Sequence, residues 1–169
     1  RILVPYLIKA AEMLDSDDQI QAIDKAMVKF GMPMGPFRLM DEIGLDVCYH
    51  VAGDLRDRLG IECSLDELAT RISRGELGKK TGKGFYKYKN GRSVKKKVKE
   101  SVDVTCLIES MTEESRKVLD EGVIDDPDML DFAMIMGTGW APFRGGPIAY
   151  DRSIRALEEG QRCVLSSKT

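Results

Sequence analysis

His50 is the only histidine of the chain and the first candidate for catalysis, because imidazole exchanges protons near neutral pH. Asp46 and Asp54 lie four residues to either side, which would place all three on one face of a helix. A catalytic histidine also needs a nucleophile or an orienting carboxylate, but Ser16 and Ser64 stand in patterns typical of helix caps. We interpret His50 as a surface or half-buried packing residue and expect no catalytic residue in this chain.

Cofactor and metal sites are not predicted either. Residues 75–84 (GELGKKTGKG) and 137–139 (GTG) are rich in glycine, but neither has the spacing of a dinucleotide fingerprint or a phosphate loop. The four cysteines are scattered without CxxC spacing, so we expect reduced thiols and no metal. These are Cys48, Cys63, Cys106 and Cys163.

Charge is unevenly distributed. The net charge of −2 does not indicate a nucleic-acid-binding protein, yet ten basic residues and no acidic one lie between Lys79 and Lys99. That segment could attract phosphate, a membrane or nucleic acid, or it could be a solvated linker. Its aromatic residues, Phe85, Tyr86 and Tyr88, are expected to pack rather than to stack on bases.

The periodicity of apolar residues predicts helices along most of the chain. Pro36, Pro127 and Pro147 suit first turns of helices, and Gly31 suits a helix end. Residues 85–88 alternate and precede the turn signal Asn90-Gly91, which favours a short extended piece. The expected helices cover about 1–15, 16–30, 36–59 with a break at Gly44, 64–74, 102–121, 127–137 and 147–159.

Two stretches of sequence repeat. Residues 23–38 (IDKAMVKFGMPMGPFR) and 130–144 (LDFAMIMGTGWAPFR) share an apolar-Asp-x-Ala-Met run, a glycine and Pro-Phe-Arg, with one residue fewer in the second copy. We predict an all-α protein made of two tandem copies of one helical unit, related by a pseudo-twofold axis. The predicted divisions are a first unit over 1–91, a basic linker over 92–101 and a second unit over 102–169.

The glycines beside the Pro-Phe-Arg segments leave two interpretations open. A glycine next to a helix N-terminus lets a ligand approach free backbone N–H groups. The same residues could instead only set the entry angles of the helices. These segments are 35–38 and 142–147.

Three segments resemble the C-terminal part of L-3-hydroxyacyl-CoA dehydrogenases, in particular the duplicated C-terminal region of multifunctional fatty-acid oxidation enzymes. They are 31–47, 79–88 and 137–153, and the resemblance covers about residues 1–160. It implies an enzyme that oxidises a 3-hydroxyacyl-CoA to the 3-ketoacyl-CoA with NAD in β-oxidation. It also implies that NAD and the catalytic His–Glu pair belong to an N-terminal Rossmann domain outside this sequence.

The resemblance gives this chain a substrate-side role. The family's catalytic Asn would stand immediately before Arg1, so we expect a fragment that is inactive alone, with no cofactor of its own. Residues carried over as lining of the acyl-CoA site are Arg1, Ile2, Pro5, Tyr6, Met34, Gly35 and Pro36.

Partners and alternatives follow from the same resemblance. The implied partners are the Rossmann domain, the acyl-CoA substrate, an enoyl-CoA hydratase domain and a thiolase subunit, with no transmembrane segment. The default compartment is bacterial cytoplasm, or a mitochondrion or peroxisome in a eukaryote. The alternatives are a non-catalytic helical scaffold module and a nucleic-acid-binding protein that uses residues 79–99.

Overall fold

The computed structural model describes residues 1–60, 63–94 and 102–166, which form eight α-helices, three 3₁₀ turns and one β-hairpin. The mostly helical prediction is therefore confirmed. The chain divides into two compact units, Arg1–Met111 (unit 1) and Thr112–Thr169 (unit 2), with the boundary inside helix α6. In the described part, no helix is both long and apolar enough to cross a membrane.

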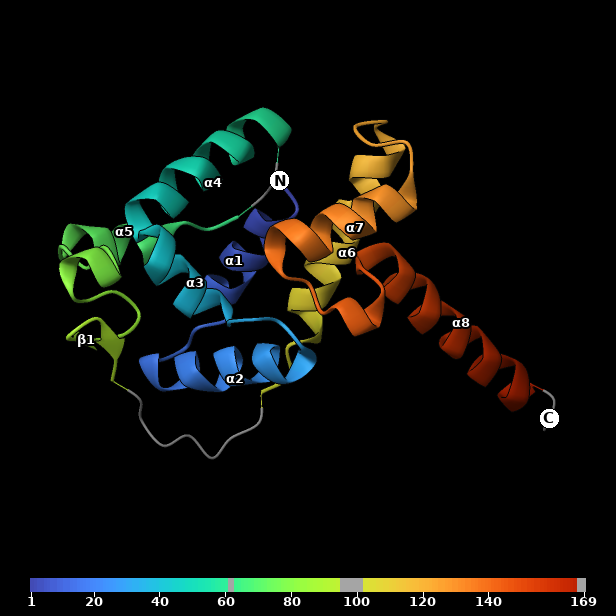
Figure 1. Ribbon diagram of the computed structural model, residues 1–169, viewed down its shortest axis with the longest axis horizontal. Coiled ribbons are helices and arrows are strands. Elements are labelled where there is room, and N and C mark those ends of the chain that lie inside the picture. The colour runs from blue at the N-terminus through green and yellow to red at the C-terminus, as the bar shows by residue number, and fades with distance from the viewer. Residues whose placement is uncertain (61–62, 95–101, 167–169) are drawn as a thin grey trace. The chain divides into compact units, whose positions relative to one another are not determined.

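Unit 1 is built around helix α3, which contacts α1, α2 and α4. Figure 1 shows α3 between the neighbouring helices of this unit. The fully buried side chains of unit 1 include Tyr6 of α1, Ile23 of α2, and Phe37 and Met40 of α3. The helices are α1 (Leu3–Glu12), α2 (Ile20–Phe30), α3 (Pro36–Ile43), α4 (Leu45–Leu59) and α5 (Asp66–Ser73).

Glycine and proline set the helix boundaries, as predicted. Gly31 ends α2 with a φ of 122°, and Pro36 lies in the first turn of α3. Gly44, with a φ of 107°, separates α3 from α4. Such a φ is strained for residues with a Cβ, so the break predicted at Gly44 is confirmed.

A small hairpin follows α5. The 3₁₀ turn Lys79–Thr81 leads to strands β1 (Tyr88–Lys89) and β2 (Arg92–Ser93), which pair antiparallel. Asn90 and Gly91 join them with φ values of 52° and 72°, as a two-residue type I′ turn requires. The predicted turn is confirmed, whereas Arg92 and Ser93, expected in a connector, form the second strand. Residues 95–101 of the predicted linker lie outside the described residues.

Unit 2 contains the end of α6 (Thr105–Asp120), α7 (Pro127–Thr138) and α8 (Pro147–Ser166). The Asp126 carboxylate accepts hydrogen bonds from the backbone N–H groups of Asp128 and Met129, which confirms the predicted N-cap. The predicted helix start at Pro147 is confirmed, whereas Pro142–Arg144 forms only a 3₁₀ turn. The second Pro-Phe-Arg segment therefore does not open a helix.

Candidate functional site

A buried carboxylate joins two helices of unit 1. Asp24 lies on α2 and accepts hydrogen bonds from the backbone N–H groups of Phe37 (2.9 Å) and Arg38 (3.0 Å) in the first turn of α3. Those N–H groups have no partner within their own helix, and the positive end of the helix dipole favours an anion. We call Asp24 together with Gly35, Phe37 and Arg38 the first clamp.

Gly35 permits this close approach. A Cβ at Gly35 would overlap the Cα and the carboxylate of Asp24. The backbone of Gly35 is extended, with a φ of −78° and a ψ of 169°, so its conformation is open to any residue. Gly35 is therefore required because Asp24 occupies the space that a side chain would need. This supports the interpretation that the glycine sets the entry angle of α3.

The hairpin region supplies a third hydrogen bond to the first clamp. The Tyr86 hydroxyl donates to Asp24 at 2.7 Å. Burial raises the pKa of Asp24 to about 6 despite these three hydrogen bonds, and the Asp41 charge adds to the rise. Burial, followed by the Asp24 charge, raises the pKa of Tyr6. The Tyr6 hydroxyl is buried and has no hydrogen-bond partner among the described residues.

A second carboxylate, Asp41 on α3, holds the segment before the hairpin. It accepts hydrogen bonds from the backbone N–H groups of Phe85 and Tyr86 and from the Tyr88 hydroxyl, each at 2.9 Å. Gly84 passes so close that a Cβ there would overlap the Asp41 carboxylate. Burial raises the pKa of Asp41. Asp41 therefore ties the hairpin to α3.

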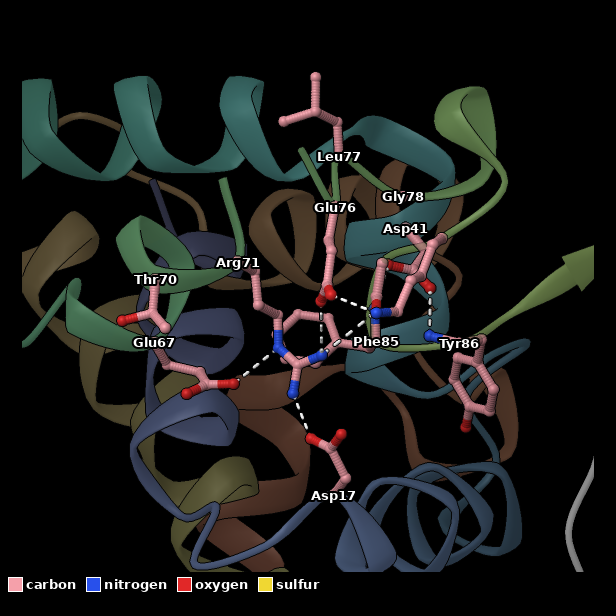
Figure 2. A network of polar contacts seen from close by, with 12 residues as sticks. Asp17, Asp41, Glu67, Thr70, Arg71, Glu76, Leu77, Gly78, Phe85 and Tyr86 are labelled. Carbon is pink, nitrogen blue, oxygen red and sulfur yellow. Dashed lines mark hydrogen bonds and ion pairs between the residues drawn. The ribbon is translucent and has the colours of Figure 1, made fainter. Parts of the chain in front are cut away.

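Arg71 on α5 is the centre of the network drawn in Figure 2. Its guanidinium donates to Asp17 and Glu67 and to the carbonyl oxygen of Gly84, and it lies 4.4 Å from the centroid of the Phe85 ring. Glu76 lies 3.6 Å from the same guanidinium. Only 6% of Arg71 is exposed, so its charge is balanced by these carboxylates. The network fixes residues 76–86 against the helices.

Unit 2 repeats the clamp. Asp131 on α7 accepts hydrogen bonds from the N–H groups of Ile148 (2.8 Å) and Ala149 (2.9 Å) in the first turn of α8. A Cβ at Gly146 would overlap the Asp131 side chain. We call Asp131 with Gly146, Ile148 and Ala149 the second clamp.

The two clamps differ in the spacing between the carboxylate and its N–H donors. The first N–H donor lies 13 residues after Asp24 but 17 after Asp131, so the spacing from the carboxylate to the first donor is longer in unit 2 by 17 − 13, or four residues. Gly146-Pro147 thus corresponds to Gly35-Pro36. The two Pro-Phe-Arg segments that match in sequence therefore hold different positions relative to the two clamps.

The predicted lining residues fall into two groups. Tyr6, Gly35 and Pro36 are buried inside unit 1, around the first clamp. The other four are half-buried, and they are Arg1, Ile2, Pro5 and Met34.

The other candidates of the sequence show no catalytic arrangement. His50 is exposed, and its Nδ1 lies 2.6 Å from the carbonyl oxygen of Asp46. Burial raises the pKa of the Cys48 thiol to about 11, so this thiol is a poor nucleophile. Among the described residues, no group of three or more His, Cys, Asp or Glu side chains could hold a metal.

Sequence reasoning missed the buried carboxylates and Arg71. Asp24 and Asp131 were noticed only as letters of the repeat. Each interrupts an apolar helix face beside a fully buried residue, Ile23 or Leu130. A carboxylate at such a position needs donors, and that was the available signal.

The helical architecture with its two clamped helix pairs can be compared with known protein families. Residues 1–88 match the family described as 3-hydroxyacyl-CoA dehydrogenase, C-terminal domain. This match covers half of the sequence, and the chain belongs to that family.

Curated relatives extend the similarity over almost the whole chain. The fatty acid oxidation complex subunit alpha of Shewanella sp. (strain ANA-3) is 38% identical over 95% of this chain. The protein of the same name from Vibrio campbellii is 36% identical over 89%. The chain spans about a quarter of the length of these relatives, 26% and 23%.

A solved structure shares the fold. The 3-hydroxybutyryl-CoA dehydrogenase of Escherichia coli K12 matches 91% of this chain and 52% of its own, with a TM-score of 0.73. Its sequence identity is 19%, so the likeness concerns the fold alone.

Proposed function

We propose that this chain is the substrate-side helical part of an NAD-dependent 3-hydroxyacyl-CoA dehydrogenase of fatty-acid β-oxidation. The observation that carries the proposal is the 38% identity to a fatty acid oxidation complex subunit alpha over 95% of the chain. In the whole enzyme, a Rossmann domain outside this sequence would hold NAD and the catalytic pair. The chain's own residues would orient the acyl thioester and exclude water, which lowers the barrier through positioning.

We infer further that the two clamped helix pairs are tandem copies of one unit. In both, a helix carboxylate receives two N–H groups of the next helix, beside a glycine that the carboxylate crowds. The pseudo-twofold relation, the divisions 1–91, 92–101 and 102–169, the hydratase and thiolase partners and the cytoplasmic location remain predictions.

A chimaera tests the dehydrogenase function. The chain would replace the corresponding quarter of a related alpha subunit, and NADH formation from a 3-hydroxyacyl-CoA would be measured. We expect NAD-dependent turnover that exceeds that of the truncated subunit. A folded but inert chimaera would favour the alternative of a non-catalytic scaffold module.

The lining role of the seven residues carried over from the family has a separate test in the same chimaera. Met34→Ala should raise KM for the acyl-CoA with little change in kcat, because Met34 is half-buried and would contact the substrate without reacting. Met129→Ala is the matched control, since Met129 is an exposed methionine of unit 2. Equal effects of the two substitutions would contradict the lining role.

A further inference from the structure

One face of the hairpin carries three cationic side chains beside the exposed Val94. Tyr86 and Tyr88 direct their hydroxyls to Asp24 and Asp41, and side chains alternate along a strand. Lys87 and Lys89 therefore lie on the opposite, outer face. Lys89 lies directly opposite Arg92 of the second strand. The side chains of Lys87, Lys89 and Arg92 are all exposed. We call Lys87, Lys89 and Arg92 the cationic face.

These three charges have no counter-ion in the part of the chain that the structure describes. The three lysines of the preceding loop are instead neutralised by carboxylates. Lys79 pairs with Glu42 at 2.7 Å, Lys80 pairs with Asp46 at 2.5 Å, and Lys83 pairs with Glu76. The chain thus balances its other hairpin-region lysines and leaves the cationic face open.

The geometry of the cationic face is fixed by the fold. The type I′ turn sets the register of Lys89 opposite Arg92, and like charges directly opposite one another destabilise a strand pair. The inner face is anchored by the tyrosine hydroxyls and by Ser93, whose hydroxyl accepts a hydrogen bond from Arg38 at 2.9 Å. The repulsion between Lys89 and Arg92 is one that an anion bound between them would offset.

The chemistry of the three groups suits phosphate. Guanidinium and ammonium groups are the side chains that bind phosphate oxygens, and a phosphate monoester carries about −1.5 to −2 charges at pH 7. We propose that the cationic face binds the 3′-phosphate and the diphosphate of the CoA part of the substrate. This proposal rests on the proposed function, which supplies a CoA thioester as ligand.

Nucleic acid fits the cationic face less well. Proteins that bind single strands stack bases on exposed aromatic rings, but Tyr86 and Tyr88 point inward and hydrogen-bond to carboxylates. Phe85 is buried, at 7% exposure, against Arg71 and Phe37. The aromatic residues of the basic segment are therefore not available for stacking.

Titration of the 169-residue chain with CoA and with 3′-dephospho-CoA tests the proposal. The variant Lys89→Thr with Arg92→Thr should weaken CoA binding about tenfold and the binding of dephospho-CoA less. The strand pair itself should not be destabilised, because the like-charge pair is removed. Lys25→Gln with Lys29→Gln removes two exposed charges from α2 and should leave CoA affinity within about twofold.

Each outcome decides. No binding of CoA, equal binding of CoA and dephospho-CoA, equal losses in both double variants, or tighter binding of a single-stranded oligonucleotide would each overturn the proposal. The acyl group separates this result from the proposed function. If an acyl-CoA binds more tightly than CoA but the hairpin variant has no effect, the cationic face is wrong and the function stands. If the hairpin variant binds CoA more weakly but an acyl-CoA binds no more tightly than CoA, the cationic face is supported and the proposed function is wrong.

Discussion

The two clamps place the same atoms in different surroundings. Asp131 in unit 2 accepts two backbone hydrogen bonds, whereas Asp24 in unit 1 accepts those two and a third from Tyr86. The pKa of both carboxyl groups is raised, mainly by burial. The comparison shows that two N–H donors are enough to fix the entry of a helix. The additional bond in unit 1 serves to attach the hairpin.

The outer faces of α2 and α7 also differ. When Asp24 is aligned with Asp131, the exposed Lys25 and Lys29 of α2 correspond to Phe132 and Met136 of α7. These apolar side chains are 59% and 70% exposed. The carboxylates of the two helices make the same contact with the next helix, whereas the outer faces differ in polarity.

The largest expected effect comes from removing the space for the carboxylate. Gly35→Ala should lower the free energy of unfolding of unit 1 by about 4 kcal/mol, because its Cβ would overlap the backbone and the carboxylate of Asp24. Gly146→Ala should have a similar effect in unit 2, where a φ of 96° adds strain. Urea unfolding, with hydrogen exchange at the Phe37 and Ile148 amides, measures each unit.

Gly53→Ala is the matched control for both glycines. Gly53 lies within α4, and no atom lies within 4 Å of a Cβ built there. Alanine should stabilise that helix by about 1 kcal/mol. If Gly35→Ala were equally harmless, the first clamp would not exist in solution.

The second prediction compares the carboxylates themselves. Asp24→Ala should cost about 3 kcal/mol and Asp131→Ala about 2 kcal/mol, since three donors are left without an acceptor in unit 1 and two in unit 2. A double-mutant cycle of Asp24→Ala with Tyr86→Phe isolates the additional bond, which we expect to contribute about 1 kcal/mol. A coupling of zero would mean that the hairpin is not attached through Asp24.

The third prediction concerns pH. Asp24 has a folded-state pKa of about 6, against an ordinary value of 3.8. Because this pKa is raised, the folded state binds the proton more tightly than the unfolded state. The stabilisation is complete below about pH 4 and is lost as the pH rises through about 6. The loss should amount to about 2 to 3 kcal/mol.

Other carboxyl groups titrate in the same pH range, so the quantity to measure is the difference in unfolding free energy between wild type and a variant of Asp24. The stability of wild type minus that of Asp24→Asn should fall between pH 4 and pH 7 and then level off. Glu42 and Asp46, whose pKa values are lowered by Lys79 and Lys80, change stability in the opposite direction but cancel in the difference. A flat difference curve would show that Asp24 titrates normally.

Local signals in the sequence predicted the helices and their ends because each depends on one or two residues. Pro36, Gly44 and the Asn90-Gly91 turn act through their own backbone preferences. The partners of Asp24 could not be predicted, since its donors lie 13 and 14 residues away and are backbone groups of any residue type. Arg71 likewise gathers groups from Asp17 to Gly84, which only the folded chain brings together.

The repeat shows how matching letters can mislead. Pro-Phe-Arg begins α3 at Pro36 but forms a 3₁₀ turn at Pro142. What the two clamps share is the glycine that a carboxylate crowds and the proline after it. The sequence shows an Asp at the matching position of each stretch, but not the spacing between this Asp and its N–H donors.

The smallest effect is expected on the outer face of α7. Phe132→Lys with Met136→Lys would give α7 the lysines that α2 has at the corresponding positions. Since both side chains are already more than half exposed, the stability of unit 2 should change by no more than about 0.5 kcal/mol per substitution. The reciprocal variant, Lys25→Phe with Lys29→Met, should be equally neutral for unit 1. A loss above about 2 kcal/mol in unit 2 alone would show that Phe132 and Met136 are buried by contacts in solution. The apolar outer face of α7 would then contribute to the stability of unit 2.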